Sequence, residues 1–461
     1  MTEQTHDLIV LGGGSGGYAC ALRAAELGKR AALVERDERL GGTCLLRGCV
    51  PTKALLESAS VMDHVNRAAE WGIDATGSAD WPKVLEFGAG IVDKKVKGLT
   101  GLVVARGIEI VSGEGRLVEG PGVVVGDRTL TAADVVIATG SRPKLLPGMQ
   151  IGSRIVTSDQ ALWMQSLPSS AIVIGAGAVG VEFASLLRSF GAEVTILEAL
   201  PRMVPLEDEE ISKQLDRAFR KRGIKSFTGV SVTEWKDEPD RVEVSYQAPD
   251  GSPATVSADM CLVAVGRGPV TEDLGLEEAG IQLDRGYVKV DGSLQTTASH
   301  VWAVGDVAGT PLQFAHTAFL EGMNAAERIA GLDVPEIDYV GIPRVTFSTP
   351  EVASVGLTEA QARDRGFEVE VKSLSLQILA KAAILGEGGV CKVVAIPEGG
   401  PVLGVHLIGP HATDLIAEAM LVTNWEAGAV EVSNLIHPHP TLSEGLGETL
   451  LALAGKPLHS P

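Results

Sequence analysis

Short apolar runs and glycine-rich turns alternate along the first third of the chain. The run DLIVL at residues 7–11 is followed by the turn GGGSGG and by a helical pattern that ends at Gly28. A second apolar run, AALVE, ends at Glu35. A strand, a glycine turn, a helix and a second strand form the unit that binds dinucleotides in doubly wound α/β proteins. We therefore expect such a domain at the start of the chain.

The same pattern returns in the middle of the chain. Residues 171–199 read AIVIGAGAVGVEFASLLRSFGAEVTILEA, again a strand, a glycine turn, a helix and a strand. The segments 135-VVIATGSRP-143 and 261-CLVAVGRGP-269 also resemble each other, since each is an apolar strand followed by glycine, a basic residue and proline. This internal repetition predicts two dinucleotide-binding domains in one chain.

The pattern changes character from about Asp338. Residues 344–358, RVTFSTPEVASVGLT, alternate as strands do, and helical patterns follow around residues 411–427 and 441–454. We predict an α/β protein with two Rossmann-like dinucleotide-binding domains and a C-terminal α+β domain. The expected boundaries are 1–148 for the first domain, 149–268 for the second, 269–337 for a central segment that completes the first site, and 338–461 for the last domain.

Composition and charge narrow the class of function. The chain has 39 basic and 59 acidic residues, a formal net charge of −20, which argues against nucleic acid or an anionic membrane as a partner. The start of the chain lacks the pattern of a signal peptide, and no apolar run reaches the ~18 residues of a membrane span. We expect a cytoplasmic protein. Cys20, Cys261 and Cys391 stand in apolar or helical sequence and are predicted to be buried structural thiols.

Cys44 and Cys49 lie close together in 41-GGTCLLRGCVPTKALL-56. A straight helix would separate their Cα atoms by roughly 8.6 Å, whereas a disulfide needs less than about 7 Å. Gly48 gives the backbone freedom to bend, and Pro51 favours a helix start at that position. Two further ligands at zinc-site spacing are missing, so we expect no metal. Two bystander thiols and a redox pair both remain possible at this point.

Each predicted dinucleotide unit carries three glycines and one acidic residue. Glycines allow a tight turn and a close approach of the backbone to pyrophosphate, while the carboxylate accepts hydrogen bonds from a ribose. A carboxylate in the second unit accepts from a 2′-hydroxyl and repels a 2′-phosphate, which favours NAD over NADP. The residues are Gly12, Gly14, Gly17 and Glu35 in the first unit, and Gly175, Gly177, Gly180 and Glu198 in the second.

Eight motifs in order give the chain a family resemblance. They are GGGSGG, GGTCLLRGCVPTKALL, ATGSRP, GAGAVGVE, AVGRGP, AVGDVAG, TPEVASVGLTE and HPHPTLSE. Together they resemble the pyridine nucleotide–disulfide oxidoreductase family over nearly the whole chain. The resemblance implies FAD in the first domain, NAD in the second, and a C-terminal domain that forms a homodimer.

The resemblance also implies a role for each matching residue. Cys44 and Cys49 would form a redox disulfide, with Cys49 facing the flavin and Cys44 as the exposed thiol that exchanges with substrate. Lys53 would lie beside the reactive nitrogen of the flavin and pair with Glu182. Further cofactor contacts would come from Thr43, Thr139, Gly140, Gly266 and, on the ribityl chain, Asp306.

The segment 437-HPHPTLSE-444 would supply the proton chemistry. By the resemblance, His439 is the general acid/base and Glu444 holds its other ring nitrogen. A local alternative is that Thr441 and Glu444 form a capping box for the next helix. His437 is interpreted as structural.

The implied function is oxidation of dihydrolipoyl groups with NAD⁺, and the partner would be the lipoyl group of a carrier protein or acyltransferase from a 2-oxoacid dehydrogenase or glycine cleavage complex. The alternatives are a related reductase with another disulfide, quinone or metal-ion substrate, and a low-turnover flavin redox sensor. This chain departs from the usual family pattern at Leu46, Arg47 and Pro438, and over residues 375–392. Arg47 would either act on anions or a thiolate, or be a solvated loop residue.

Overall fold

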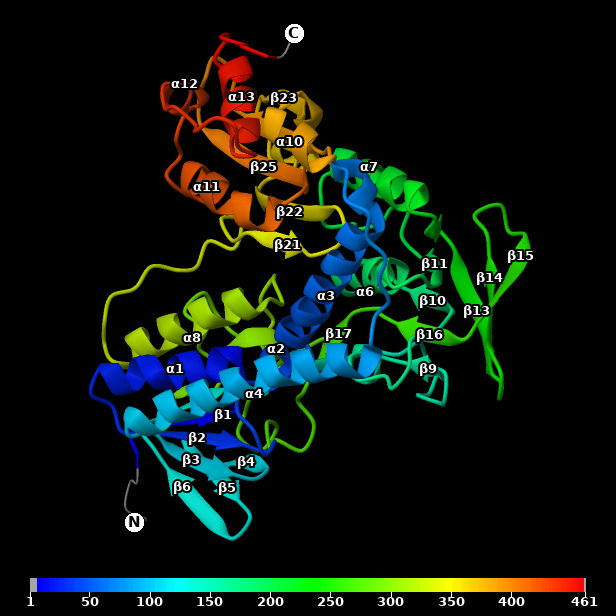
Figure 1. Cartoon of the computed structure of the whole chain (residues 1–461). Coiled ribbons are helices and arrows are strands. Elements are labelled where there is room, and N and C mark those ends of the chain that lie inside the picture. The colour runs from blue at the N-terminus through cyan, green and yellow to red at the C-terminus, as the bar shows by residue number, and fades with distance from the viewer. Residues whose placement is uncertain (1–5, 460–461) are drawn as a thin grey trace. The chain divides into compact units, whose positions relative to one another are not determined.

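The computed structural model describes residues 6–459, which divide into two compact units (Figure 1). The first unit combines the chain up to Leu55 with Pro82–Lys144 and Gly266–Tyr339. The second combines Leu56–Trp81 and Leu145–Val265 with the chain from Val340 onward. Each unit is therefore assembled from separate stretches of sequence.

A five-stranded parallel sheet forms the centre of the first unit. Alternate residues of its strands pack on opposite faces, as in a sheet covered on both sides. One face packs on helices α1 (Ser15–Glu26), α4 (Trp81–Ala105) and α8 (Ala315–Ile329), and the other on a small antiparallel sheet. The strand order is β20 (Val301–Ala303), β7 (Asp134–Ile137), β1 (Leu8–Leu11), β2 (Ala31–Glu35) and β3 (Glu109–Ser112); the small sheet is β4 (Gly115–Val118), β5 (Gly122–Val125) and β6 (Arg128–Thr131).

Helices α1 and α8 run side by side in Figure 1. Their backbones approach closely, because a Cβ atom on Gly322 would lie 2.2 Å from the Gly16 carbonyl oxygen. This contact joins the glycine turn of the first repeat to a helix about 300 residues later in the chain.

The second unit repeats the same parallel sheet. The strand order is β9 (Ile155–Val156), β16 (Met260–Val263), β10 (Ser170–Ile174), β11 (Glu193–Glu198) and β12 (Lys225–Thr228), so that β10 and β11 take the places of β1 and β2. Helices α6 (Ala178–Ser189) and α7 (Glu209–Lys221) follow these strands, and β13 (Ser231–Asp237), β14 (Val242–Gln247) and β15 (Pro253–Ala258) form an antiparallel sheet. The predicted internal repeat is confirmed.

The C-terminal part of the second unit is an antiparallel sheet with helices packed on it, which confirms the predicted α+β character. Its strand order is β21 (Arg344–Thr346), β22 (Glu351–Gly356), β25 (Val402–Gly409), β24 (Val390–Ala395) and β23 (Glu370–Ser375). The helices are α9 (Glu359–Asp364), α10 (Ala380–Leu385), α11 (Ala412–Asn424), α12 (Ala429–Val432) and α13 (Glu444–Leu453).

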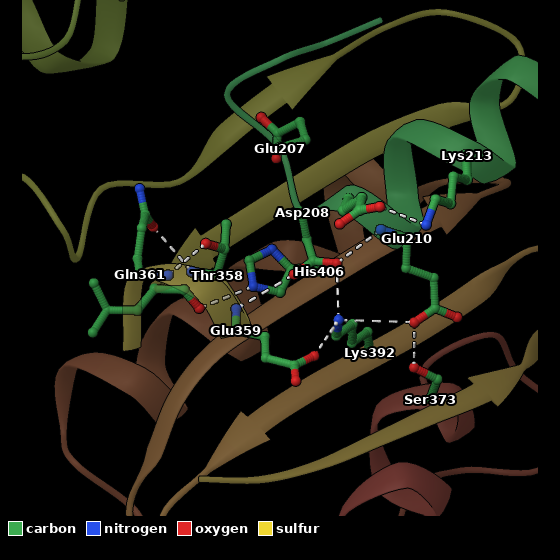
Figure 2. A network of polar contacts seen from close by, with 12 residues as sticks. Glu207, Asp208, Glu210, Lys213, Thr358, Glu359, Gln361, Ser373, Lys392 and His406 are labelled. Carbon is green, nitrogen blue, oxygen red and sulfur yellow. Dashed lines mark hydrogen bonds and ion pairs between the residues drawn. The ribbon is translucent and has the colours of Figure 1, made fainter. Parts of the chain in front are cut away.

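A buried polar network connects α7 to this antiparallel sheet (Figure 2). Lys392 on β24 places its Nζ 2.9 Å from Asp208 Oδ1 and 2.9 Å from Glu359 Oε2. Asp208 also caps α7 by accepting the Glu210 N–H. Segments nearly 200 residues apart in sequence are thus held together by charge.

The short elements that position the candidate site complete the fold. They are α2 (Gly42–Arg47), α3 (Cys49–Arg67), β8 (Ser141–Pro143), β17 (Arg267–Pro269), the hairpin β18 (Leu283–Asp284) and β19 (Tyr287–Val288), α5 (Ser158–Ala161), and the 3₁₀ turns η1 (Ala68–Trp71), η2 (Gly305–Val307) and η3 (Leu376–Ile378).

Candidate active site and dinucleotide sites

The two glycine turns have nearly the same geometry. Gly12 follows β1 with a φ of 112°, and Gly175 follows β10 with a φ of 102°. A Cβ atom on Gly12 would lie 2.3 Å from the Ala138 carbonyl oxygen, and one on Gly175 would lie 2.4 Å from that of Ala264. A side chain would therefore clash with the neighbouring strand end in both turns, so the sheet itself requires glycine here.

The third glycine of each turn is also required by packing, but the middle one is not. A Cβ atom on Gly17 would lie 1.8 Å from the Gly12 carbonyl oxygen, and Gly180 repeats this contact at 1.9 Å. Gly14 meets nothing nearer than the Gly42 Cα atom at 3.7 Å, and Gly177 meets nothing within 4 Å. Space is left at the middle position of each turn.

Helices α1 and α6 begin at these open positions. Gly14 and Gly177 are their N-caps, and neither helix has a side-chain cap. The first N–H groups of each helix and its positive dipole end therefore remain available to an anion. Open space beside uncapped N–H groups fits the pyrophosphate of a dinucleotide.

The two acidic residues at the strand ends also match each other. Glu35 accepts hydrogen bonds from the N–H groups of Gly13 and Asp37, both at 2.8 Å. Glu198 accepts from Ala176 at 2.5 Å and from Leu200 at 2.7 Å. A carboxylate has about four lone-pair sites, so each fixed carboxylate retains capacity to accept from ribose hydroxyls.

Asp306 lies in a polar cluster of the first unit. It stands in η2 after β20, and Ser141 Oγ donates a hydrogen bond to Asp306 Oδ2 at 2.5 Å. Arg267 Nε donates to Ser141 Oγ at 2.7 Å and lies 3.9 Å from Asp306 Oδ2. Thr43 Oγ1 joins this cluster 3.3 Å from Arg267 Nη2.

Ser141 and Arg267 are functional candidates that the sequence analysis missed. They belong to the repeated segments ATGSRP and AVGRGP, which pair as the antiparallel strands β8 and β17. The similarity between these two segments is the feature of the sequence that could have indicated this pairing. Thr139, Gly140 and Gly266 shape this crossover: Thr139 Oγ1 donates to the Val270 carbonyl at 2.7 Å, and the glycines have positive φ angles.

A broken helix carries the cysteine pair. Cys44 lies in α2 and Cys49 is the first residue of α3, with the non-helical Gly48 between the two helices. The predicted bend at Gly48 is confirmed. The predicted helix start at Pro51 is wrong by two residues, because the Gly48 carbonyl accepts the Thr52 N–H at 3.0 Å and closes the first turn earlier.

The roles of Cys49 beside the flavin and of Cys44 towards the substrate stay predictions. Cys49 is exposed and Cys44 is half-buried. Cys44 lies in α2 against the start of α1, where Ser15 hydrogen-bonds to its thiol. The hydrogen bond between the two thiols and the burial of Cys44 raise the pKa of the Cys44 thiol, while Ser15 and Lys53 act in the opposite direction. The two sulfurs therefore lie within contact of each other.

Tyr18 is a further residue near the cysteine pair that the sequence analysis missed. Burial, together with the charges of Cys44 and Cys49, raises the pKa of the Tyr18 phenol to about 12. Its ring packs against Phe319 of α8, with ring centroids 5.6 Å apart. Tyr18 therefore presents a neutral hydroxyl beside the pair at neutral pH.

Lys53 and Glu182 lie in different units. Lys53 is on α3, where its charge lowers the pKa of the Cys44 thiol. Glu182 is on α6, where its Oε1 accepts the Phe347 N–H at 2.9 Å. The pairing of these two residues stays a prediction.

His439 and Glu444 form a hydrogen-bonded pair. His439 Nδ1 lies 2.8 Å from Glu444 Oε1, and the histidine side chain is 67% exposed. Burial alone would raise the pKa of the Glu444 carboxyl, but the Thr441 N–H and His439 lower it below the usual value. An ionised Glu444 that accepts the Nδ1 proton leaves Nε2 as the basic nitrogen.

The alternative capping box is only half formed. Glu444 Oε2 accepts the Thr441 N–H at 2.8 Å, as a capping box requires. The Thr441 hydroxyl, however, donates to the Pro438 carbonyl at 2.7 Å. One carboxylate therefore serves both the backbone turn and His439.

Arg47 and the three isolated cysteines have clear structural positions. Arg47 ends α2, and its guanidinium pairs with the Asp37 carboxylate, so it is not a solvated loop residue, and a role towards anions or a thiolate stays a prediction. Cys20, Cys261 and Cys391 have no exposed surface, which confirms the prediction, and burial raises the pKa of each thiol to about 12.

Comparison with known families decides the assignment. Residues 6–322 match the model of the pyridine nucleotide-disulphide oxidoreductases, and residues 342–450 match the dimerisation domain of the same group. The chain belongs to the pyridine nucleotide-disulphide oxidoreductase family. This membership confirms the predicted fold class and the resemblance drawn from the eight motifs.

Full-length relatives in this family are similar to the chain. A dihydrolipoyl dehydrogenase of Bacillus subtilis is 42% identical, with 98% of this chain and 99% of the relative covered. One from Thermus scotoductus is 40% identical over 99% of both chains. The crystal structure of LpdA from Mycobacterium tuberculosis superposes with a TM-score of 0.89 at 27% identity, covering 97% of this chain and 99% of that one. The flavoprotein disulfide reductase RclA from Escherichia coli gives 0.88 at 26% identity, with coverage of 98% and 100%.

Family membership gives the reaction type and the cofactors. Pyridine nucleotide-disulphide oxidoreductases use FAD and NAD, and the two glycine turns with Glu35 and Glu198 fit those dinucleotides. The match to the dimerisation domain supports a homodimer. Within residues 6–459, no helix is both long enough and apolar enough to span a bilayer.

Proposed function

We propose that this chain oxidises dihydrolipoyl groups with NAD⁺, as a homodimeric dihydrolipoyl dehydrogenase. The observation that carries the proposal is the position of the Cys44 and Cys49 pair beside the first glycine turn. A Cβ atom on Gly42 at the start of α2 would lie 2.6 Å from Gly14 Cα, so the cysteine-bearing helix begins against the turn. Relatives with this enzyme name are 36–42% identical over almost the whole chain, which supports the choice of substrate.

In the proposed reaction the cysteine pair begins as a disulfide. A dihydrolipoyl thiolate attacks the Cys44 sulfur, the Cys44–Cys49 bond breaks, and Cys49 leaves as a thiolate. The second dihydrolipoyl thiol transfers its proton to His439 Nε2 and displaces Cys44 from the mixed disulfide. The lipoyl group departs as a disulfide, and both cysteines of the enzyme are reduced.

The remaining residues hold cofactors and protons in place. When bound, FAD supplies the two-electron chemistry that links the reduced cysteine pair to NAD⁺. Gly12, Gly14 and Glu35 would bind its adenosine diphosphate part, and Asp306 would bind its ribityl chain. Lys53, paired with Glu182, would lie at its reactive ring.

Two further residues select the nucleotide and the histidine tautomer. Glu198 would accept hydrogen bonds from the NAD ribose and exclude a 2′-phosphate. Glu444 holds His439 Nδ1 and so keeps Nε2 available for proton transfer.

The proposal includes the protein's setting. His439 would act on the cysteine pair of the partner subunit, which makes the homodimer the active form. The substrate would be the lipoyl group of a carrier protein or acyltransferase in a 2-oxoacid dehydrogenase or glycine cleavage complex. A thiol pair that cycles in this way suits the reducing cytoplasm.

The test is turnover by the purified yellow dimer with dihydrolipoamide and NAD⁺. Wild type should form NADH, and Cys44→Ser or Cys49→Ser should lower kcat by at least about 10³-fold. Cys261→Ala, at a buried cysteine in the second parallel sheet, is the matched control and should retain activity. A flavin-loaded wild type that forms no NADH contradicts the choice of substrate, and a fully active Cys49→Ser contradicts the dithiol mechanism.

A further inference from the structure

His437 lies two residues before His439 and is fixed by two helices. Its Nε2 lies 2.6 Å from Glu418 Oε1 on α11, and its side chain is only 12% exposed. On the other side the ring packs against the backbone of α13, since a Cβ atom on Gly447 would lie 2.4 Å from His437 Nδ1. A hydrogen bond and a close packing contact therefore hold one orientation of the ring.

The surroundings of His437 also favour its protonated form. The hydrogen bond to Glu418 raises the pKa of the His437 imidazole, burial opposes this shift, and the charges of Glu418 and Glu444 add to it. The acidic groups that face the ring thus come from α11 and from α13. Glu444 also binds His439, so one carboxylate interacts with both histidines.

Pro438 makes the connection between the two histidines stiff. Its ring fixes its own φ near −65°, and it restricts the backbone of the preceding His437 to extended conformations. Its carbonyl accepts a hydrogen bond from the Thr441 hydroxyl at 2.7 Å. Few backbone rotations then remain between the anchored His437 and the exposed His439, so the position of one limits that of the other.

We propose that His437 and Glu418 are a positioning pair, which sets the placement of the His439 imidazole for proton transfer. The inference rests on the proposed function, because it assigns His439 the role of acid/base. Neither His437 nor Glu418 touches the reacting atoms in this scheme. Their effect passes along the stiff backbone through Pro438 and through the shared carboxylate Glu444.

The proposal predicts a split between kinetic parameters. His437→Asn and Glu418→Gln should each lower kcat for dihydrolipoamide oxidation about tenfold, because a misplaced acid/base group transfers protons in fewer of its conformations. The KM for NAD⁺, the FAD content and the sedimentation of the dimer should stay as in wild type. The kcat of the double variant should be little lower than that of either single variant, since each substitution removes the same anchoring hydrogen bond.

Pro438→Ala tests whether His437 acts on His439 through the stiff backbone at Pro438. Without the stiff connection, adding His437→Asn should change kcat far less than it does when Pro438 is present. His411→Asn is the matched control: His411 is exposed at the start of the same helix α11, and asparagine tolerates its left-handed backbone with a φ of 57°. This control should leave kcat unchanged.

Histidine NMR of the loaded dimer gives a readout that needs no substrate. The His439 signal, identified by its loss in His439→Gln, should be single in wild type and broadened or doubled in Glu418→Gln. Kinetics within about twofold of wild type and a single His439 signal in both anchor variants would overturn the proposal. A wild type that fails to oxidise dihydrolipoamide overturns the proposed function instead, and the NMR comparison still decides whether the pair positions His439.

Discussion

His406 Nε2 donates a hydrogen bond to the Leu357 carbonyl oxygen at 3.0 Å, inside the polar network of Figure 2. The His406 ring is fully buried, and its Nδ1 has no hydrogen-bond partner among residues 6–459. A second proton on this ring would therefore be placed in a site without an acceptor. Burial lowers the pKa of His406 to about 4.

This relation predicts a loss of stability in mild acid. His406 binds its second proton near pH 6.5 in the unfolded chain and only near pH 4 in the folded chain. The stability that depends on a neutral His406 is therefore fully present above about pH 6.5 and is lost as the pH falls towards 4. The difference between these two pKa values corresponds to roughly 3 kcal/mol in the free energy of unfolding. His406→Gln, which can still donate to Leu357, should flatten the pH dependence of the urea midpoint over this range. An unchanged slope would contradict the prediction, and His411→Asn serves as the control.

Lys392 should be essential for stability. Its side chain is 7% exposed and that of Asp208 is 3% exposed, so Lys392→Met leaves the buried Asp208 carboxylate and the partly exposed Glu359 carboxylate without their cation. We expect a loss of about 3–5 kcal/mol in the free energy of unfolding, measured by denaturant titration. Lys213→Met, at a surface pair with Glu209, should leave the melting temperature unchanged. Equal effects of the two substitutions would show that burial of the network is unimportant.

The roles of the middle and third glycines of the first turn can be separated by two alanine variants. Gly17→Ala should fold poorly, because its Cβ would meet the Gly12 carbonyl oxygen at 1.8 Å. Gly14→Ala should fold normally, but its methyl group would occupy the space left for pyrophosphate and weaken FAD binding about tenfold or more. Flavin content and the melting temperature of the flavin-free protein measure the two effects. Full flavin affinity in Gly14→Ala would contradict this placement of the pyrophosphate.

Arg47 should stabilise the protein without taking part in the reaction. Its pair with Asp37 is about one-third exposed and should contribute about 1 kcal/mol or less. Arg47→Ala should lower the melting temperature by a few degrees and leave kcat within about threefold of wild type. Asp37→Ala should have the same effect, and the double variant should add nothing to either. A kcat loss of about tenfold or more in Arg47→Ala alone would instead indicate a role at the thiols.

The elements of both dinucleotide units could be predicted because their signals are local. The apolar runs ending at Leu11 and Glu35, and the glycines between them, specify a strand, a turn and a strand without knowledge of the rest of the chain. The repeat and the C-terminal antiparallel sheet with its helices followed from the same patterns. The two residues of the His439–Glu444 contact are only five positions apart, so this contact could also be predicted from the sequence.

What the sequence did not reveal depends on distant contacts. The half-burial of Cys44 arises from α1, and Arg47 finds its partner Asp37 only when α2 folds back towards the end of β2. The position of Arg267 next to Ser141 requires that β8 and β17 pair across more than a hundred residues. No periodicity or local spacing in the sequence indicates such long-range contacts.

The first parallel sheet has a strand supplied very late by the chain. β20 at residues 301–303 pairs with β7, and the intervening residues 145–265 belong wholly to the second unit. During synthesis, the sheet that starts first is therefore completed only after residues 145–265 of the second unit have left the ribosome. Until then the open edge of β7 is a surface that a nascent chain must keep from pairing with other strands.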